Sequence, residues 1–98
     1  MKAVVVRYRT KAGRADENQE LIEAVFREIE DRQPVGFSYR VFRLEDGMTF
    51  VHTVVEHDVE NPDSLGDLPA FQAFTKDIAD RCEEPPVATG ATVVGTSG

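Results

Sequence analysis

The chain has 98 residues, of which 41% are hydrophobic and 30% charged, and its formal net charge is -7 at pH 7. This length and composition predict one globular domain spanning residues 1–98. The acidic balance argues against binding to duplex nucleic acid or to an anionic membrane surface, because both need a basic face on the protein.

Cysteine and histidine give no sign of a disulfide or metal site. Cys82 is the only cysteine, and no Cys/His cluster has metal-ligand spacing. The apolar run at the N-terminus is too short for a signal peptide, and no segment approaches membrane-spanning length. We therefore expect a cytoplasmic protein without a metal or cofactor.

The first element that the sequence predicts is a strand, Lys2–Thr10. Its β-branched centre, Val4-Val5-Val6, favours extended backbone. Apolar residues occupy both alternating sets of positions, with Ala3 and Val5 on one face and Val4, Val6 and Tyr8 on the other. A strand that is apolar on both faces is expected to be covered on both faces.

A helix is predicted next, over residues 14–32. Asp16 and Glu17 in its first turn suit the positive end of the helix dipole, and Pro34 ends it. The apolar stripe lies on one side, so this helix is expected to pack on a sheet. Its members recur at helical spacing: Leu21, Ile22, Val25, Phe26 and Ile29.

Residues 36–57 predict a β-hairpin, because two apolar-rich runs flank Glu45-Asp46-Gly47. Asp-Gly between such runs is a strong hairpin signal. Both alternating sets of positions again carry large apolar side chains, as in the first strand.

The C-terminal part predicts a loop, a second helix and a last short strand. The loop covers residues 58–66, Asp67 is expected to cap the helix, and Pro69 fits its first turn. The stretch Glu83-Glu84-Pro85-Pro86 is expected to end the helix, and residues 90–95 to form the strand. The helical stripe comprises Leu68, Phe71, Phe74, Ile78 and Cys82.

The element order β-α-β-β-α-β predicts an α+β, ferredoxin-like fold with one antiparallel sheet and both helices on one face. The opposite face also carries apolar residues and needs a cover. We expect that cover to be a second copy of the chain, packed sheet on sheet in a two-fold homodimer.

Two stretches resemble a known family. The first strand VVVRYR (residues 4–9) and the helix start LPAFQAF (residues 68–74), in this element order, resemble the antibiotic-biosynthesis-monooxygenase domains of the dimeric α+β barrel superfamily. The resemblance implies a homodimer formed by the sheets and a pocket between the sheet and helices of each protomer. It also implies, as one activity of the family, cofactor-independent oxygenation of aromatic molecules.

The sequence departs from the family at the positions that carry its chemistry. It has no tryptophan, whereas the cofactor-free oxygenases use Trp, Tyr and Asn to hold a phenolic substrate. The haem-degrading members use an asparagine on the first strand and a histidine on a helix. Neither is present here, so we expect no haem.

Two residues are candidates for catalysis. His52 lies in mid-strand and could act as a general base of near-neutral pKa, while Tyr39 on the neighbouring strand could orient oxygen. The alternative for His52 is a half-buried residue that is bonded to a strand or faces the dimer partner. The alternative for Tyr39 is core packing.

Other residues are candidates for contact with a small apolar or aromatic ligand. Tyr8 could hydrogen-bond it and Arg40 could bind an anionic group, although packing and cross-strand pairing are the alternatives. Three phenylalanines would be pocket walls if the core is incomplete, and core otherwise: Phe26, Phe71 and Phe74.

Two functions remain open at this point. One is an enzyme in which His52 deprotonates a phenol or enol that then reacts with O2. The other is a non-catalytic binding or interaction module. A pocket of several hundred cubic ångströms lined by His or Tyr would favour the first, and a layer filled by phenylalanines the second.

Overall fold

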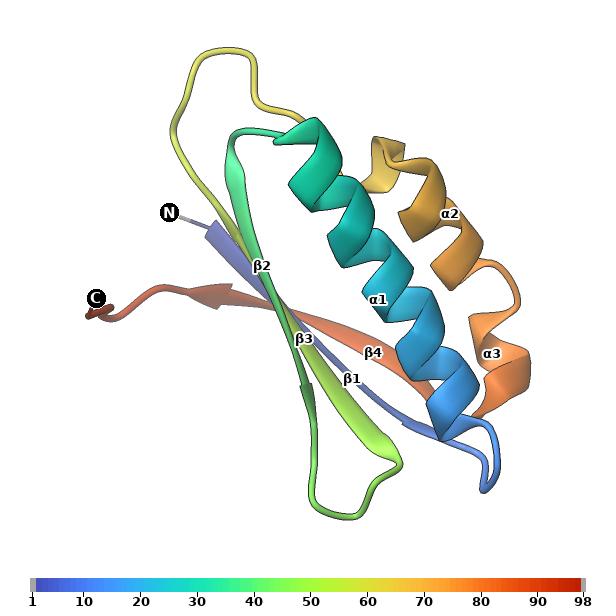
Figure 1. Cartoon of the computed structure of the whole chain (residues 1–98). Helices are drawn as coiled ribbons and strands as arrows, with labels where there is room; N and C mark the ends of the chain where they lie inside the picture. The colour runs from blue at the N-terminus through green and yellow to red at the C-terminus, as the bar shows by residue number, and fades with distance from the viewer. Residues whose placement is uncertain (1, 98) are drawn as a thin grey trace.

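A computed structural model of the chain describes residues 2–97. Its four strands form one antiparallel sheet in the order β2-β3-β1-β4. The elements are β1 (Lys2–Thr10), α1 (Ala15–Arg32), β2 (Phe37–Arg43), β3 (Thr49–Glu56), the 3-10 helix η1 (Leu65–Asp67), α2 (Pro69–Thr75), α3 (Ile78–Arg81) and β4 (Cys82–Thr92). All helices lie on one face of the sheet (Figure 1), so the predicted α+β, ferredoxin-like fold is confirmed.

The hairpin is confirmed, with β2 and β3 joined by a turn that Asp46 organises. The Asp46 carboxylate accepts hydrogen bonds from the backbone N–H groups of Met48 and Thr49 and from the Thr49 hydroxyl. Gly47 follows with φ +74°, a conformation that glycine adopts without steric cost. The Asp-Gly signal therefore had a local cause, which is why the sequence was sufficient to locate this turn.

The second helix differs from the prediction, because it is broken into two. Asp67 does not cap it; the Glu28 carboxylate of α1 instead accepts a hydrogen bond from Ala70 N–H at the start of α2. The helix then stops at Thr75, and Asp77 takes a left-handed conformation with φ 59°. The Arg81 guanidinium donates to the Phe74 and Lys76 carbonyl oxygens at this break, so a side chain from α3 satisfies groups that a continuous helix would have paired through its backbone.

The last strand also differs from the prediction, because β4 begins at Cys82 rather than at residue 90. Cys82 is therefore a buried strand residue rather than a helix residue. The Pro85-Pro86 pair lies inside the strand, opposite the single residue Tyr8, as a bulge in the pairing of β4 with β1. Proline is tolerated there because β4 is an edge strand, where the missing N–H interrupts pairing on one side only.

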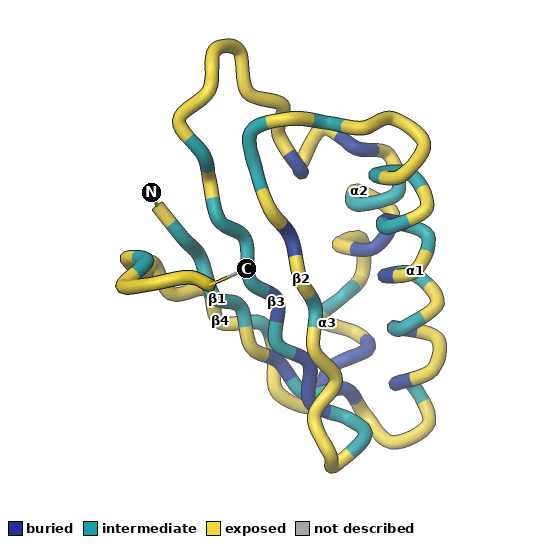
Figure 2. The backbone as a smooth tube through the Cα atoms, turned by 60° about the vertical axis from the view of Figure 1, so that its left-hand side comes forward, coloured by how far each residue is buried: buried dark blue, intermediate teal, exposed yellow. Residues whose placement is uncertain are grey.

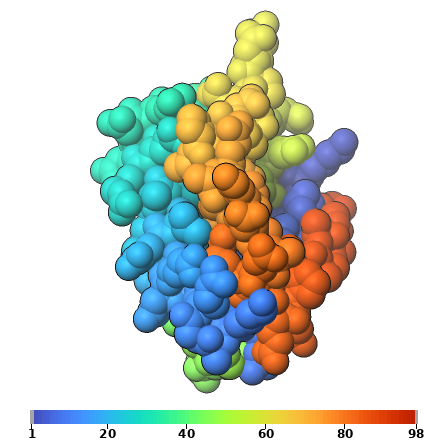
Figure 3. All heavy atoms as spheres, turned by 90° about the vertical axis from the view of Figure 1, so that its right-hand side faces the viewer, coloured from blue at the N-terminus to red at the C-terminus, as the bar shows by residue number. Residues whose placement is uncertain are grey.

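The core lies between the sheet and the helices. Figure 2 shows buried residues along β1, β3 and α1, whereas β4 is mostly exposed. Figure 3 shows α1 and the α2–α3 segment side by side over this core. Ile22 and Val25 of α1 pack with Phe74 of α2 against Tyr8 and Phe50 of the sheet.

The other face of the sheet, here called the open sheet face, carries no helix. One row across its four strands consists of Phe42, Val51, Arg7 and Val87; Phe42 is 48% exposed and Val87 64%. The register therefore decides what the sequence left undecided: His52 faces the helices and not the open sheet face. The open sheet face comprises Ala3, Val5, Arg7, Ser38, Arg40, Phe42, Val51, Thr53, Val55, Val87, Thr89 and Ala91.

Candidate functional site

His52 lies at the centre of a buried cluster between the sheet and the helices. Its Nε2 atom lies 2.7 Å from the Tyr8 hydroxyl of β1, and its Nδ1 atom lies 2.7 Å from the Tyr39 hydroxyl of β2. All three side chains project from neighbouring strands toward the helices. The two residues chosen as catalytic candidates, His52 and Tyr39, are therefore in direct contact.

Two residues from the helices extend this cluster. The Asn18 amide nitrogen donates to the Tyr8 hydroxyl at 2.8 Å, and the Arg81 Nε donates to Asn18 Oδ1 at 3.2 Å. The five side chains form what we call the buried polar network. Their residues are exposed by 9% or less: Tyr39 9%, His52 4%, Arg81 3%, Tyr8 2% and Asn18 0%.

Aromatic rings enclose the network. The His52 ring stacks on Phe74, with centroids 5.2 Å apart, and the Tyr8 ring stacks on Phe50 at 5.5 Å. The Tyr39 ring stacks on Phe26 at 5.0 Å. These rings exclude water, which strengthens each hydrogen bond inside and raises the cost of leaving one unmade.

Burial also shifts the protonation equilibria of the network. Desolvation lowers the pKa of His52 from 6.5 to about 4, so the imidazole is neutral at pH 7. Desolvation raises the pKa of both Tyr8 and Tyr39, so both hydroxyls keep their protons. As the protein stands, His52 has no free nitrogen and is a weak base.

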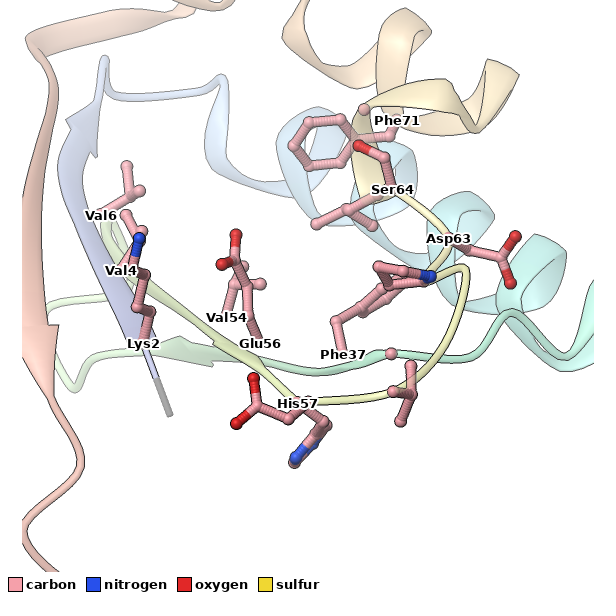
Figure 4. Close-up of a pocket in the computed structure, with 16 residues that line it drawn as sticks. Lys2, Val4, Val6, Phe37, Val54, Glu56, His57, Asp63, Ser64 and Phe71 are labelled. Carbon is pink, nitrogen blue, oxygen red and sulfur yellow. The ribbon is translucent and has the colours of Figure 1, made fainter.

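A pocket lies beside the network, between the end of the sheet and the loop that precedes α2. Its volume is about 870 Å³, within the usual range for small-molecule sites. We call it the sheet–helix pocket. Figure 4 shows Val4 and Val6 of β1 and Val54 of β3 facing the same space as Phe71 of α2.

Polar residues surround the mouth of this pocket. Lys2 and Glu56 come from strand ends, and His57, Asp58 and Asp63 come from the loop that follows β3. Two hydrogen bonds between Val35 and Asp63 hold this loop in place. The Val35 N–H donates to the Asp63 carboxylate, and the Asp63 N–H donates to the Val35 carbonyl oxygen.

Gly36 allows the loop to lie close to the strand. It has φ +102°, and a Cβ atom there would lie 2.5 Å from the Pro62 Cβ. Any other residue would push the loop away from the pocket mouth.

The inner wall of the sheet–helix pocket borders the buried polar network. Val6 is paired with His52 and Val54 with Tyr39 in the sheet. Phe71 lines the pocket and also meets the Tyr39 ring edge-on, with centroids 6.2 Å apart. The pocket and the network are therefore neighbours, although none of His52, Tyr8 and Tyr39 lines the pocket.

The remaining ligand-contact candidates divide between the two faces. Phe26, Phe71 and Phe74 lie in the layer that surrounds the network, and among them Phe71 reaches the pocket. Arg40 lies on the open sheet face, paired with Thr53. It is thus separated by the sheet from the other candidates and is not part of this site.

Sequence reasoning missed Asn18 and Arg81. A signal for Asn18 was present, because residues 18, 22, 25 and 29 share one helix face and the other three are apolar. A polar residue on such a face is expected to bond inside the core. Arg81 gave no comparable signal, because its role depends on a helix break that local sequence does not specify.

The described residues contain no group of three or more His, Cys, Asp and Glu side chains placed to hold a metal ion. Within residues 2–97, no helix combines the length and the apolar character that crossing a membrane requires.

Comparisons with known proteins bear on the fold. A scan against protein-family models finds no match, and a search of the curated proteins finds none either. Solved structures, by contrast, match over nearly the whole chain. One is Rv0793 from Mycobacterium tuberculosis, with a TM-score of 0.75 and 16% identity over 99% of this chain and 98% of the other.

Two further matches carry functional names. A provisionally named antibiotic biosynthesis monooxygenase from Nitrosomonas europaea matches with a TM-score of 0.78 and 13% identity, over 97% of this chain and 100% of the other. A point mutant of SnoaB, a cofactor-independent oxygenase from Streptomyces nogalater, matches with a TM-score of 0.67 and 18% identity, over 97% and 94%. At these identities the likeness establishes the fold, and the resemblance to antibiotic-biosynthesis-monooxygenase domains is confirmed at that level.

Proposed function

We propose that this chain, which has the fold of antibiotic-biosynthesis-monooxygenase domains, binds a small, largely apolar or aromatic molecule in the sheet–helix pocket. The observation that carries this proposal is the pocket itself, with a volume of about 870 Å³ and a wall that includes Val4, Val6, Val54 and Phe71. An apolar wall with polar groups at the mouth is typical of sites that bury the body of a ligand and leave one end in water.

The proposed assembly is a homodimer joined through the open sheet face. Phe42 and Val87 are large apolar side chains that are 48% and 64% exposed, and they lie in one row with Val51. An exposed apolar patch on a small domain favours association, and a two-fold axis would bring the same patch of each copy together.

The proposed reaction is cofactor-independent oxygenation. A phenol or enol in the pocket loses a proton, and the resulting carbanion attacks O2. A CH2 group then becomes a carbonyl, with one oxygen atom of O2 in the product and the other in water. His52 is the proposed base, and because both of its nitrogens are bonded, the proton would have to reach it through the hydroxyl of Tyr39 or Tyr8.

A second candidate function is binding without catalysis. It is favoured by the burial of the network, because His52, Tyr8 and Tyr39 are buried and do not line the pocket. Under this alternative the network serves stability, and the pocket alone serves function.

One experiment tests the binding and separates the two candidates. The probe is 1-naphthol, a small aromatic phenol, and the measurement is isothermal titration calorimetry. Wild-type protein is expected to bind it, and Val54→Trp, which fills the pocket, is expected to abolish binding. Val94→Trp makes the same change at a fully exposed position outside the pocket and should leave binding intact.

Equal binding by Val54→Trp and wild type would exclude the pocket as the site. Oxygen uptake, measured with an electrode in the presence of bound 1-naphthol and absent in Val54→Trp, would support oxygenation. Binding without oxygen uptake would favour the binding module for this class of ligand.

A further inference from the structure

Arg81 fixes the direction in which hydrogen bonds are donated along the buried polar network. A guanidinium group can only donate hydrogen bonds, so the Asn18 atom that faces the Arg81 Nε at 3.2 Å must be the oxygen. The amide nitrogen of Asn18 must then face the Tyr8 hydroxyl, 2.8 Å away. Arg81 thus decides which way the Asn18 amide is turned.

The Tyr8 hydroxyl is the next group in this series of donors and acceptors. Its hydroxyl oxygen accepts from Asn18, and its single proton needs an acceptor within the protein, because Tyr8 is 2% exposed. The nearest acceptor is Nε2 of His52, 2.7 Å away. The opposite tautomer, with the proton on Nε2, would leave the Tyr8 proton rather than the Tyr39 proton without an acceptor among these side chains. An unpaired buried donor costs about 1–3 kcal/mol, and the cost is greater at Tyr8, which is 2% exposed against 9% for Tyr39.

The Tyr39 hydroxyl is the last group in the series. A neutral imidazole carries one proton, and with Nε2 accepting, that proton must be on Nδ1 and point to the Tyr39 oxygen, 2.7 Å away. The Tyr39 hydroxyl proton is then the last donor of the series. Its ring lies between Phe26 and Phe71, and Phe71 is part of the pocket wall.

We infer that Asn18 and Arg81 are positioning residues that hold His52 as the Nδ1–H tautomer and leave the Tyr39 hydroxyl as the donor at the pocket side of the network. This assignment depends on the donor and acceptor groups of five buried side chains and holds whatever the pocket binds. It refines the role of His52, because the nitrogen that can receive a proton is the one that faces Tyr8.

Nuclear magnetic resonance of protein labelled with 15N at histidine tests the inference without any ligand. Correlations between the ring nitrogens and the ring protons identify the protonated nitrogen of His52 at neutral pH. The expected result for the wild type is the Nδ1–H tautomer. The Nε2–H tautomer in the wild type would overturn the inference.

The variant Asn18→Asp tests whether Asn18 determines the tautomer of His52. The new carboxylate, held ionised by Arg81, can only accept, so Tyr8 must donate to it and must accept from His52. The expected result is a switch of His52 to the Nε2–H tautomer, with Tyr39 donating to Nδ1. An Asn18→Asp protein that folds and keeps the Nδ1–H tautomer would overturn the role of Asn18.

A matched pair of tyrosine variants gives a second test if Asn18→Asp does not fold. Tyr39→Phe leaves the Tyr8 donor in place, so His52 is expected to remain Nδ1–H. Tyr8→Phe removes that donor, so the single tautomer is expected to be lost in favour of a mixture. A purely structural role would predict no difference between the two, and the opposite pattern would overturn the inference.

Discussion

The Tyr8 hydroxyl oxygen lies 2.7 Å from Nε2 of His52, and both side chains are buried between the sheet and the helices. The contact joins β1 to β3 through side chains as well as through the backbone ladder. It also holds a titratable group in the buried core, where the neutral imidazole is favoured over the charged form. The stability of the fold is therefore linked to the protonation of one histidine.

The first prediction concerns pH. Desolvation lowers the pKa of folded His52 to about 4, against 6.5 for the exposed group, so the unfolded chain takes up a proton first as the pH falls. The stabilisation is complete above pH 6.5 and is lost as the pH falls toward 4. Uptake of one proton by the unfolded chain over this interval lowers the free energy of unfolding by about 3 kcal/mol.

Urea unfolding at several pH values across this interval measures the loss. His52→Gln cannot titrate there, so its free energy of unfolding should fall less steeply than that of the wild type. Equal slopes for the two proteins would show that His52 is not the group responsible.

The second prediction compares the two tyrosines. Tyr8→Phe leaves both the Asn18 amide and a ring nitrogen of His52 without a partner, whereas Tyr39→Phe leaves only the Nδ1–H group. At about 1–3 kcal/mol for each unpaired buried group, Tyr8→Phe should destabilise the protein about twice as much. Chemical denaturation of both variants checks the order, and a larger loss for Tyr39→Phe would be inconsistent with the network as described.

The third prediction concerns the break between α2 and α3. Arg81→Ala removes the donors that satisfy the Phe74 and Lys76 carbonyl groups and the Asn18 oxygen, and should cost about 3 kcal/mol. Arg81→Lys keeps the charge but not the fork of donors, and should recover only part of the loss. Amide hydrogen exchange should accelerate in α2 and α3 before the sheet; uniform acceleration would argue against a local role.

The fourth prediction concerns the open sheet face. Phe42→Glu places a charge in the apolar row with Val51 and Val87 and should convert a homodimer into a monomer. Phe42→Leu keeps the apolar character and should stay dimeric. Analytical ultracentrifugation at micromolar concentration measures both, and a monomeric wild type would contradict the proposed assembly.

Local sequence predicted the elements whose causes are local. The turn at Asp46-Gly47 and the end of α1 before Pro34 depend on residues next to them in the chain. The broken second helix and the early start of β4 could not be predicted in this way. The first depends on Arg81 reaching back to carbonyl groups, and the second on an edge position that tolerates Pro85-Pro86.

The candidate site was predictable in part for a similar reason. His52, Tyr8 and Tyr39 were recognisable as polar groups on apolar strands, but both alternating sets of positions were apolar, so the sequence could not choose the face. The pairing register made that choice. It placed His52 toward the helices and Arg40 on the open sheet face.

The measurement that tests the proposed function most directly is the site at which a small aromatic molecule contacts the protein. Nuclear Overhauser effects between 1-naphthol and the methyl groups of the protein report this site. We expect contacts with Val4, Val6 and Val54, whose side chains line the sheet–helix pocket. Contacts confined to Val51, Val55 and Val87 on the open sheet face would contradict it.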